Sequence, residues 1–400
     1  MRKLFFALMV GIGAACVPAV AQVMPRPPDI AARSFMLLDV TADQILAAKD
    51  IDSPVEPASL TKLMSAYLVF DALRLGTISL QQTLPVSELA WHQPGSRMFI
   101  DPKMKVPVED LIKGMIVQSG NDATIALAEG LAGSVERFVQ LMNQQAVALG
   151  MTSTSFKNPT GLTAVGHITT ARDLSILATR LMRDFPGYMP YYAIKKYHYE
   201  GTPAANDGNR NLLLLRDPTV DGLKTGHTAA AGFCMIATAK RDFPNLGTPS
   251  EYPGTPSGSG PRRLLVIVLG TASENARANE SQKLLNWGFS AFEAVKLFDA
   301  NQPVVSPPIW KGKSAQALLG RPQPIIVAVP TGSAAKIVTQ VARPDPLVAP
   351  LAKGQAVGRL KIKLGEQSLF DLPLLALDTV EEAGLLGRAW DAMRLWLRSM

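Results

Sequence analysis

A change in sequence pattern near residue 300 constrains the fold of this chain more than any other feature. Before this point, stretches with apolar residues at helical spacing are mixed with a few short apolar runs. Residues 303–379 instead hold short alternating runs rich in Val, Ile, Pro and Gly, a pattern typical of strands. A chain of 400 residues also exceeds the size that one hydrophobic core usually serves. We therefore expect an α+β domain followed by a small all-β domain.

The first part of the chain is predicted to combine an antiparallel sheet with helices. Runs 34–39 and 44–49 are expected to pair as strands. Runs 232–239 and 263–269 are expected to form a hairpin, whose long Pro- and Gly-rich tip covers 244–261. Apolar residues at spacings of three and four predict helices over 60–75, 108–115, 123–131, 135–149, 170–183 and 280–292.

The second part is predicted to be built mainly from strands. Candidate strands are bounded by turn residues and cover 325–329, 336–341, 358–364 and 367–372. The chain then divides into four parts, namely a leader (1–21), an α+β domain (22–297), a β-rich domain (298–380) and a terminal helix (381–400).

The first 21 residues have the pattern of a secretory signal peptide. Arg2 and Lys3 are followed by an apolar run over 4–15, and Ala19-Val20-Ala21 provides small residues for cleavage. Cleavage would remove one of the two cysteines, so the mature chain would keep Cys234 without a disulfide partner. We therefore expect export across the inner membrane into the periplasm.

The last 19 residues are predicted to form an amphipathic helix. Arginines and one aspartate occupy one face, while apolar residues recur at steps of three and four on the other: Leu385, Leu386, Ala389, Trp390, Met393, Trp396, Leu397 and Met400. A terminal helix with two tryptophans and basic residues favours peripheral attachment to a membrane surface. Docking on the protein's own core or on a partner is the alternative.

Charge and metal-ligand patterns exclude some classes of function. The formal net charge is +7, but no basic run is dense enough to indicate nucleic-acid binding. The four histidines are scattered without the spacing of a metal site. We therefore expect no nucleic-acid partner, no metal and no cofactor.

The first chemical motif is Pro57-Ala58-Ser59-Leu60-Thr61-Lys62. Residues three apart at the start of a helix share a face, so Ser59 and Lys62 are expected to meet. A serine hydroxyl becomes a nucleophile when a base takes its proton, and a buried lysine can be that base because burial favours its neutral form. The backbone N–H groups at the helix start can also stabilise an oxyanion.

Two further motifs follow in the chain. In Ser119-Gly120-Asn121, the serine can relay a proton and the asparagine can bond a substrate amide; Ser273-Glu274-Asn275 matches the same loose pattern. In Lys224-Thr225-Gly226-His227, which precedes a predicted strand, the lysine and threonine can hold a carboxylate, and Gly226 lets a peptide lie against the strand edge.

The ordered set is far more specific than its parts. S-x-x-K, S-x-N and K-T-G in this order are typical of penicillin-binding proteins and class A β-lactamases. The sequence resembles the low-molecular-mass penicillin-binding proteins, the D-alanyl-D-alanine carboxypeptidases of peptidase family S11. The likeness includes residues 118–123, 221–228, 279–281 and 284–289. It implies a serine β-lactamase/transpeptidase-like fold for residues 34–295, with a β-rich second domain and an amphipathic tail.

The resemblance also implies roles for particular residues. Ser59 is the expected acylated nucleophile and Lys62 its base, while Ser119 is a catalytic residue that forms a second wall with Asn121. Lys224, Thr225 and Gly226 are expected to bind substrate.

Two expected roles concern the far end of the site. The backbone N–H groups of Ser59 and His227 are expected to form the oxyanion hole. Arg277 is similar to the family's carboxylate-binding arginine, and the alternative for it is a surface ion pair.

The expected reaction is removal of the terminal D-alanine from peptidoglycan stem pentapeptides, and β-lactam antibiotics are expected to acylate Ser59. Class A β-lactamases deacylate with a glutamate, whereas residues 158–162 (Asn-Pro-Thr-Gly-Leu) offer no acid, so weak β-lactamase activity is the lesser alternative. The same motifs would also serve an endopeptidase acting on crosslinks. A catalytically inactive protein that binds the cell wall is the alternative from a different class.

Overall fold

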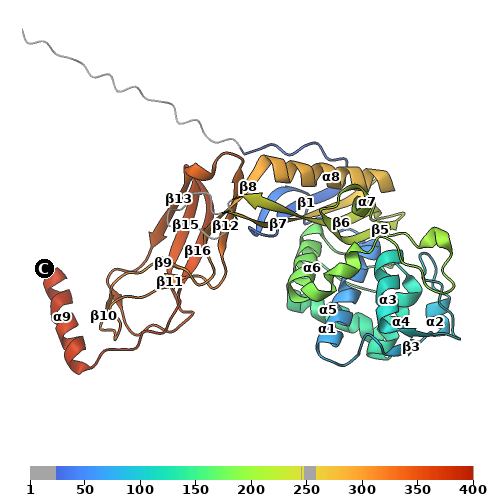
Figure 1. The fold of residues 1–400 in the computed structure, drawn as a ribbon. Helices are drawn as coiled ribbons and strands as arrows, with labels where there is room; N and C mark the ends of the chain where they lie inside the picture. Colours follow the sequence, from blue (N-terminus) through green and yellow to red (C-terminus); the bar gives the residue numbers. More distant parts are fainter. Residues whose placement is uncertain (1–23, 245, 247–257, 400) are drawn as a thin grey trace, which may run out of the picture.

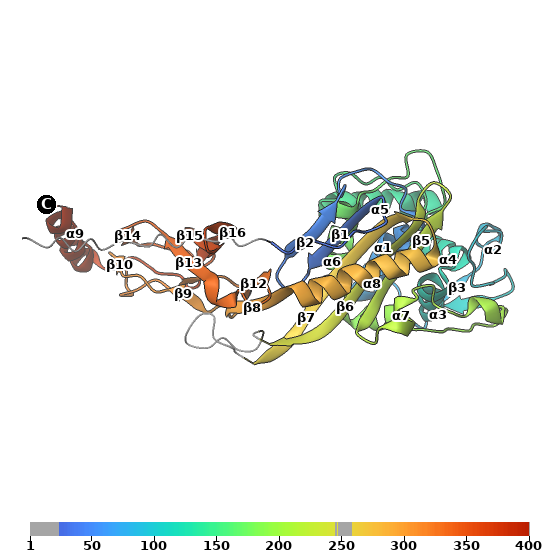
Figure 2. The same cartoon turned by 90° about the horizontal axis from the view of Figure 1, so that it is seen from above.

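The computed structural model describes residues 24–244, 246 and 258–399. The predicted signal peptide lies outside these residues, as does most of the predicted hairpin tip at 244–261. The described chain forms a broad α+β domain that continues into a narrow β domain, with a helix at the far end (Figures 1 and 2). The expected fold class is therefore confirmed.

The first domain is centred on a five-stranded antiparallel sheet with the order β2-β1-β7-β6-β5. Strands β1 and β2 have the predicted bounds, while β6 and β7 extend beyond the predicted apolar runs because their outer residues pair with each other. The strands are β1 (Ser34–Asp39), β2 (Gln44–Lys49), β5 (Val220–Thr228), β6 (Gly232–Pro244) and β7 (Ser259–Thr271).

Alternate residues of the sheet face two separate hydrophobic cores, as the two-residue period of a strand requires. On β7, Leu265 and Ile267 pack in the core that also contains α1 (Lys62–Arg74) and α6 (Ala171–Asp184). Leu264 and Val266 pack on the other face with α8 (Glu274–Ala291). Figure 2 shows α8 lying along the sheet.

Side-chain caps and glycines set several helix boundaries. Ser134 caps the start of α5 (Val135–Leu149) and Thr170 caps α6, while Gly150, which has a positive φ, caps the end of α5. Helix α8 starts six residues before the predicted position, at the residue after its cap Ser273. The prediction missed this start because the first turns of the helix carry few apolar residues. The remaining helices are α2 (Glu88–Trp91), α3 (Val108–Lys113), α4 (Asn121–Ala132), α5 (Val135–Leu149), α7 (Leu213–Arg216) and α8 (Glu274–Ala291), and a short hairpin pairs β3 (Thr83–Pro85) with β4 (Lys105–Pro107).

The second domain has its own hydrophobic core and is all-β, as predicted. Strand β8 (Phe292–Phe298) leaves the end of α8 and pairs with β12 (Ile325–Pro330), and its Val295 and Leu297 belong to the second core. A five-stranded sheet has the order β13-β15-β16-β11-β9. These strands are β9 (Pro303–Val305), β11 (Leu319–Gly320), β13 (Ile337–Ala342), β15 (Ala356–Leu364) and β16 (Gln367–Ala376), and β10 (Ile309–Trp310) pairs with β14 (Leu347–Val348).

The terminal helix α9 (Leu385–Ser399) uses its polar face to contact the second domain. The Asp391 carboxylate accepts a hydrogen bond from the backbone N–H of Lys311 at 2.6 Å, and the Arg394 guanidinium lies 5.3 Å from the centre of the Trp310 ring. The opposite face is open: Leu386 is 89% exposed and Trp390 is 59% exposed. In the described chain, no helix is both long enough and apolar enough to cross a membrane.

Candidate active site

The three motifs are more than fifty residues apart in the chain and meet in one cavity. Ser59 lies in a 3-10 turn (Ala58–Thr61) that leads into α1, and Lys62 is the first residue of that helix. Ser119 and Asn121 lie where a π-helical segment (Gly114–Gln118) ends and α4 begins. Lys224 lies on the edge strand β5.

Lys62 is buried at the centre of the site. Its Nζ lies 3.1 Å from Ser59 Oγ and 2.7 Å from Asn121 Oδ1, and it donates to the carbonyl oxygen of Thr160 at 2.6 Å. Burial lowers the pKa of Lys62 to about 7, assisted by the positive charge of Arg210 and opposed by the negative charge of Asp122. Such an amine can accept a proton from the adjacent hydroxyl near neutral pH.

A second lysine–serine pair lies beside the first. Lys224 Nζ donates to Ser119 Oγ at 2.9 Å and to the carbonyl oxygen of Thr225 at 3.0 Å. Burial lowers the pKa of Lys224, and the positive charges of Lys62, Arg210 and Arg277 lower it further. Each pair therefore places a hydroxyl beside an amine with a lowered pKa, so each can exchange a proton internally.

Asn121 bridges two parts of the site. Its side-chain oxygen accepts from Lys62, while its Nδ2 donates to the carbonyl oxygen of Pro94 at 2.7 Å. Both ends of the amide are therefore engaged within the protein, and Asn121 fixes the Lys62 amine against the loop that begins at Pro94.

Two glycines allow backbone segments to approach the Ser59 turn. A Cβ on Gly226 would lie 3.1 Å from the backbone nitrogen of Ser59, so β5 runs directly beside the turn. A Cβ on Gly161 would lie 1.8 Å from the carbonyl oxygen of Ala58, and Gly161 has a φ of +86°. A side chain is therefore excluded at Gly161, while one at Gly226 would force its neighbours to shift, and the backbone of Ser59 is confined between the Gly161 loop and β5.

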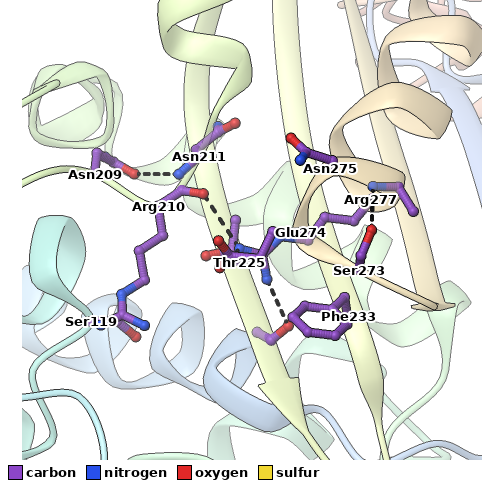
Figure 3. A network of polar contacts seen from close by, with 12 residues as sticks. Ser119, Asn209, Arg210, Asn211, Thr225, Phe233, Ser273, Glu274, Asn275 and Arg277 are labelled. Atoms are coloured by element: carbon purple, nitrogen blue, oxygen red, sulfur yellow. Dashed lines mark hydrogen bonds and ion pairs between the residues drawn. The ribbon is translucent and has the colours of Figure 1, made fainter.

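His227 and Arg277 lie at the other end of the cavity. The exposed His227 ring stacks on Phe233 with 3.9 Å between centroids. Arg277 is only 2% exposed, so its side chain is buried although it pairs with an exposed acid. Its Nη1 donates to the carbonyl oxygen of Gly226 at 3.2 Å, and its Nη2 lies 2.9 Å from Glu274 Oε1 (Figure 3).

The structure adds residues that sequence reasoning missed. Arg210 lines the cavity with Ser119, and its side chain extends toward that serine in Figure 3. The buried Asp122 carboxylate accepts hydrogen bonds from the backbone N–H groups of Met98 and Phe99 at 2.8 and 2.7 Å, and so fixes the loop opposite β5. Asp122 directly follows the second motif, whereas nothing in the sequence around Arg210 marks it.

The cavity has a volume of about 370 Å³ and is bordered by Ser59, Ser119, Asn121, Thr225, His227 and Arg277, among others. Lys62 and Lys224 lie buried behind Ser59 and Ser119. Among the residues described, no group of three or more His, Cys, Asp or Glu side chains is arranged to hold a metal ion. Every site residue predicted from the sequence therefore lies in or next to one cavity.

The antiparallel sheet is covered by helices, and the Ser59 hydroxyl lies beside the buried Lys62 amine. This combination defines a serine acyl-transferase of the penicillin-binding class. Residues 21–247 match the peptidase S11 family, described as D-alanyl-D-alanine carboxypeptidase, and residues 292–382 match the C-terminal domain of penicillin-binding protein 5. The chain belongs to peptidase family S11.

Named relatives agree with this assignment. The D-alanyl-D-alanine carboxypeptidase DacC of Escherichia coli (strain K12) is 38% identical over 372 residues, covering 91% of this chain and 88% of that protein. DacA of Haemophilus influenzae is 33% identical over 378 residues, covering 94% and 91%. The solved structure of penicillin binding protein 5 from Haemophilus influenzae matches with a TM-score of 0.81 and 34% identity over 90% of this chain and all of that one.

These similarities confirm the activity expected from the motifs. The protein is a serine-type D-alanyl-D-alanine carboxypeptidase with the fold of a penicillin-binding protein. Its family acts on peptidoglycan peptides and binds β-lactams.

Proposed function

We propose that Ser59 is the nucleophile of this carboxypeptidase and that Lys62 is its base. The observation that carries the proposal is the 3.1 Å contact between a hydroxyl and a buried amine whose pKa is about 7. The neutral amine takes the Ser59 proton as Oγ bonds to the carbonyl carbon of the penultimate D-alanine. The peptide C–N bond then breaks, the terminal D-alanine leaves as an amine, and water later hydrolyses the ester.

We assign proton delivery to the second pair. The leaving nitrogen needs a proton as the C–N bond breaks, and the Ser119 hydroxyl can supply it. Lys224, 2.9 Å away, can replace that proton. When water attacks the acyl-enzyme, Lys62 returns its proton to Ser59 Oγ as the ester breaks, and the proton that water loses restores Lys224 through Ser119, so both pairs regain their starting protonation.

We assign charge stabilisation and substrate binding to the β5 side of the cavity. The backbone N–H groups of Ser59 and His227 would hold the oxyanion, an assignment supported by the close approach of β5 to the Ser59 turn at Gly226. Thr225 and the buried cation of Arg277 would hold the C-terminal carboxylate of the peptide.

Labelled penicillin and stem pentapeptide test these assignments together. Wild-type protein is expected to bind the label covalently and to release D-alanine, detected by mass spectrometry of the products, whereas Ser59→Ala does neither. Equal labelling of the wild type and the Ser59→Ala variant would show that the nucleophile is another residue. Turnover of a crosslinked dimer, measured in parallel, separates carboxypeptidase from endopeptidase preference.

We propose that β-lactams leave Ser59 slowly. The loop facing Ser59 carries Asn158, whose side-chain oxygen accepts from the backbone N–H groups of Thr160, Gly161 and Leu162 and so shapes the loop. Residues 158–162 hold no carboxylate that could activate water in the way of class A β-lactamases. Release of the penicilloyl group within seconds would refute this assignment.

We also propose that the mature protein is periplasmic and held at the membrane by α9. The predicted signal peptide supports export, and the open apolar face of α9 supports insertion into a membrane interface. Anionic phospholipid vesicles should sediment the wild type but not the double variant Leu386→Glu, Trp390→Glu. Val147→Glu, at an 80% exposed position on α5, is the matched control and should still sediment. If the double variant sediments as well as the Val147→Glu control, α9 is not what holds the protein on the vesicles. Its open apolar face would then favour a protein partner.

A further inference from the structure

The carboxylate of Glu274 contacts the buried arginine that is proposed to hold the substrate's carboxylate. Glu274 lies in the first turn of α8, directly after the capping residue Ser273. Its Oε1 is 2.9 Å from Arg277 Nη2, and both residues line the cavity (Figure 3). Within the described part of the chain, Glu274 is the only acidic residue that borders this cavity.

The partners of Arg277 are of two kinds. Two are backbone carbonyl oxygens, those of Gly226 at 3.2 Å and Arg210 at 3.4 Å, which the fold holds in place. The third is the Glu274 side chain, which is 55% exposed whereas the Arg277 side chain is 2% exposed. A buried Arg277 Nε has no hydrogen-bond partner among the described residues. Glu274 can therefore leave Arg277 by rotating into water, while Arg277 stays.

Two charge effects favour an acid beside Arg277. A buried guanidinium without a counter-ion is strongly destabilising, and the α8 N-terminus favours a negative charge in its first turn. A second carboxylate arriving at the same guanidinium meets like-charge repulsion from Glu274. Arg97 and Arg210 also line the cavity, so it stays attractive to an anion.

We propose that Glu274 is a specificity-determining residue that competes with the C-terminal carboxylate of the substrate for Arg277. In the empty site it neutralises Arg277, and the substrate carboxylate displaces it. When D-alanine leaves, Glu274 returns and so opposes rebinding of that product. This inference rests on the proposed role of Arg277.

The test compares ligands that have and lack the carboxylate. Acylation by benzylpenicillin and by its methyl ester is measured as second-order rate constants for the wild type and Glu274→Gln. The amide keeps an acceptor for Arg277 but removes the charge. The rate with the free acid should rise about three- to tenfold and that with the ester should stay the same. The gain should shrink at high salt.

The matched control is Glu136→Gln. Glu136 also lies in the first turn of a helix capped by serine, on α5, but it does not line the cavity. The Glu136→Gln substitution should leave the acylation rates with the free acid and with the ester unchanged. An unchanged or reduced free-acid rate in Glu274→Gln, with a normal melting temperature, overturns the competition.

Arg277→Gln separates this failure from failure of the underlying assignment. A loss confined to the free acid confirms Arg277 as the carboxylate-binding residue, and Glu274→Gln then decides the inference alone. An equal loss with acid and ester refutes the assigned role of Arg277, and the inference falls with it.

Discussion

The pKa of Lys62 predicts how acylation depends on pH. If the neutral amine is the base, the acylation rate follows the fraction of Lys62 that has lost its proton. With a pKa of about 7, this fraction is roughly one-tenth at pH 6, one half at pH 7 and nine-tenths at pH 8. The second-order rate of acylation by labelled penicillin should therefore rise about tenfold between pH 6 and pH 8.

Two charges adjust this pKa in opposite directions, and each can be removed. The positive charge of Arg210 lowers the pKa of Lys62, so Arg210→Gln should move the rising limb to higher pH. The negative charge of Asp122 raises that pKa, so Asp122→Asn should move the limb to lower pH. The midpoint of the limb is compared at constant ionic strength, because both substitutions also change the maximum rate.

Arg137→Gln, on the exposed surface of α5, removes a positive charge outside the cavity and should leave the midpoint in place. A rate that is flat from pH 6 to pH 8, or a limb above pH 9, would show that the Lys62 amine is not a neutral base near pH 7. Shifts of the two site variants in the same direction would refute the electrostatic reasoning.

Three stability predictions follow from close contacts. Gly161→Ala would place a Cβ 1.8 Å from the carbonyl oxygen of Ala58, so it should cost more than about 2 kcal/mol in urea unfolding and abolish acylation. Asp122→Ala should cost about 1–3 kcal/mol, because it leaves buried backbone N–H groups without acceptors. Asp39→Ala should cost about 3–5 kcal/mol, because Arg262, 2.8 Å away and fully buried, would lose its counter-ion.

The predictions at Gly161 and Asp39 have matched controls. Gly133→Ala also places alanine at a positive φ, +80°, but meets no atom within 4 Å, so it should cost less and leave acylation intact. Equal effects at Gly161 and Gly133 would refute the steric argument. Asp242 is an exposed acid on β6 and has no ion pair in the described structure. Asp242→Ala should therefore change the free energy of unfolding far less than Asp39→Ala does.

Local signals in the sequence are sufficient to predict many elements. Helix α5 has the predicted bounds because apolar spacing, a serine cap and a terminal glycine agree at 135–149. Strands β1 and β2 also match, since a short run between turn residues has few alternative pairings. The predicted start of α8 is too late because the first turns of this helix face the cavity and carry Glu274 and Arg277 in place of apolar residues.

The order of the three motifs was enough to predict the class of enzyme, because few enzyme families combine S-x-x-K, S-x-N and K-T-G in that order. Burial then decided what those groups can do. Lys62 is an ordinary lysine in the sequence, and its pKa depends on packing against Asn121 and Thr160 from distant segments. Nothing in the sequence marks Arg210 or the carboxylate of Glu274 as a site residue, and only the tertiary structure brings their charges to the cavity. The sequence determines which charged groups are present. Their electrostatic free energies depend on distances and on the dielectric environment, and only the folded chain defines these.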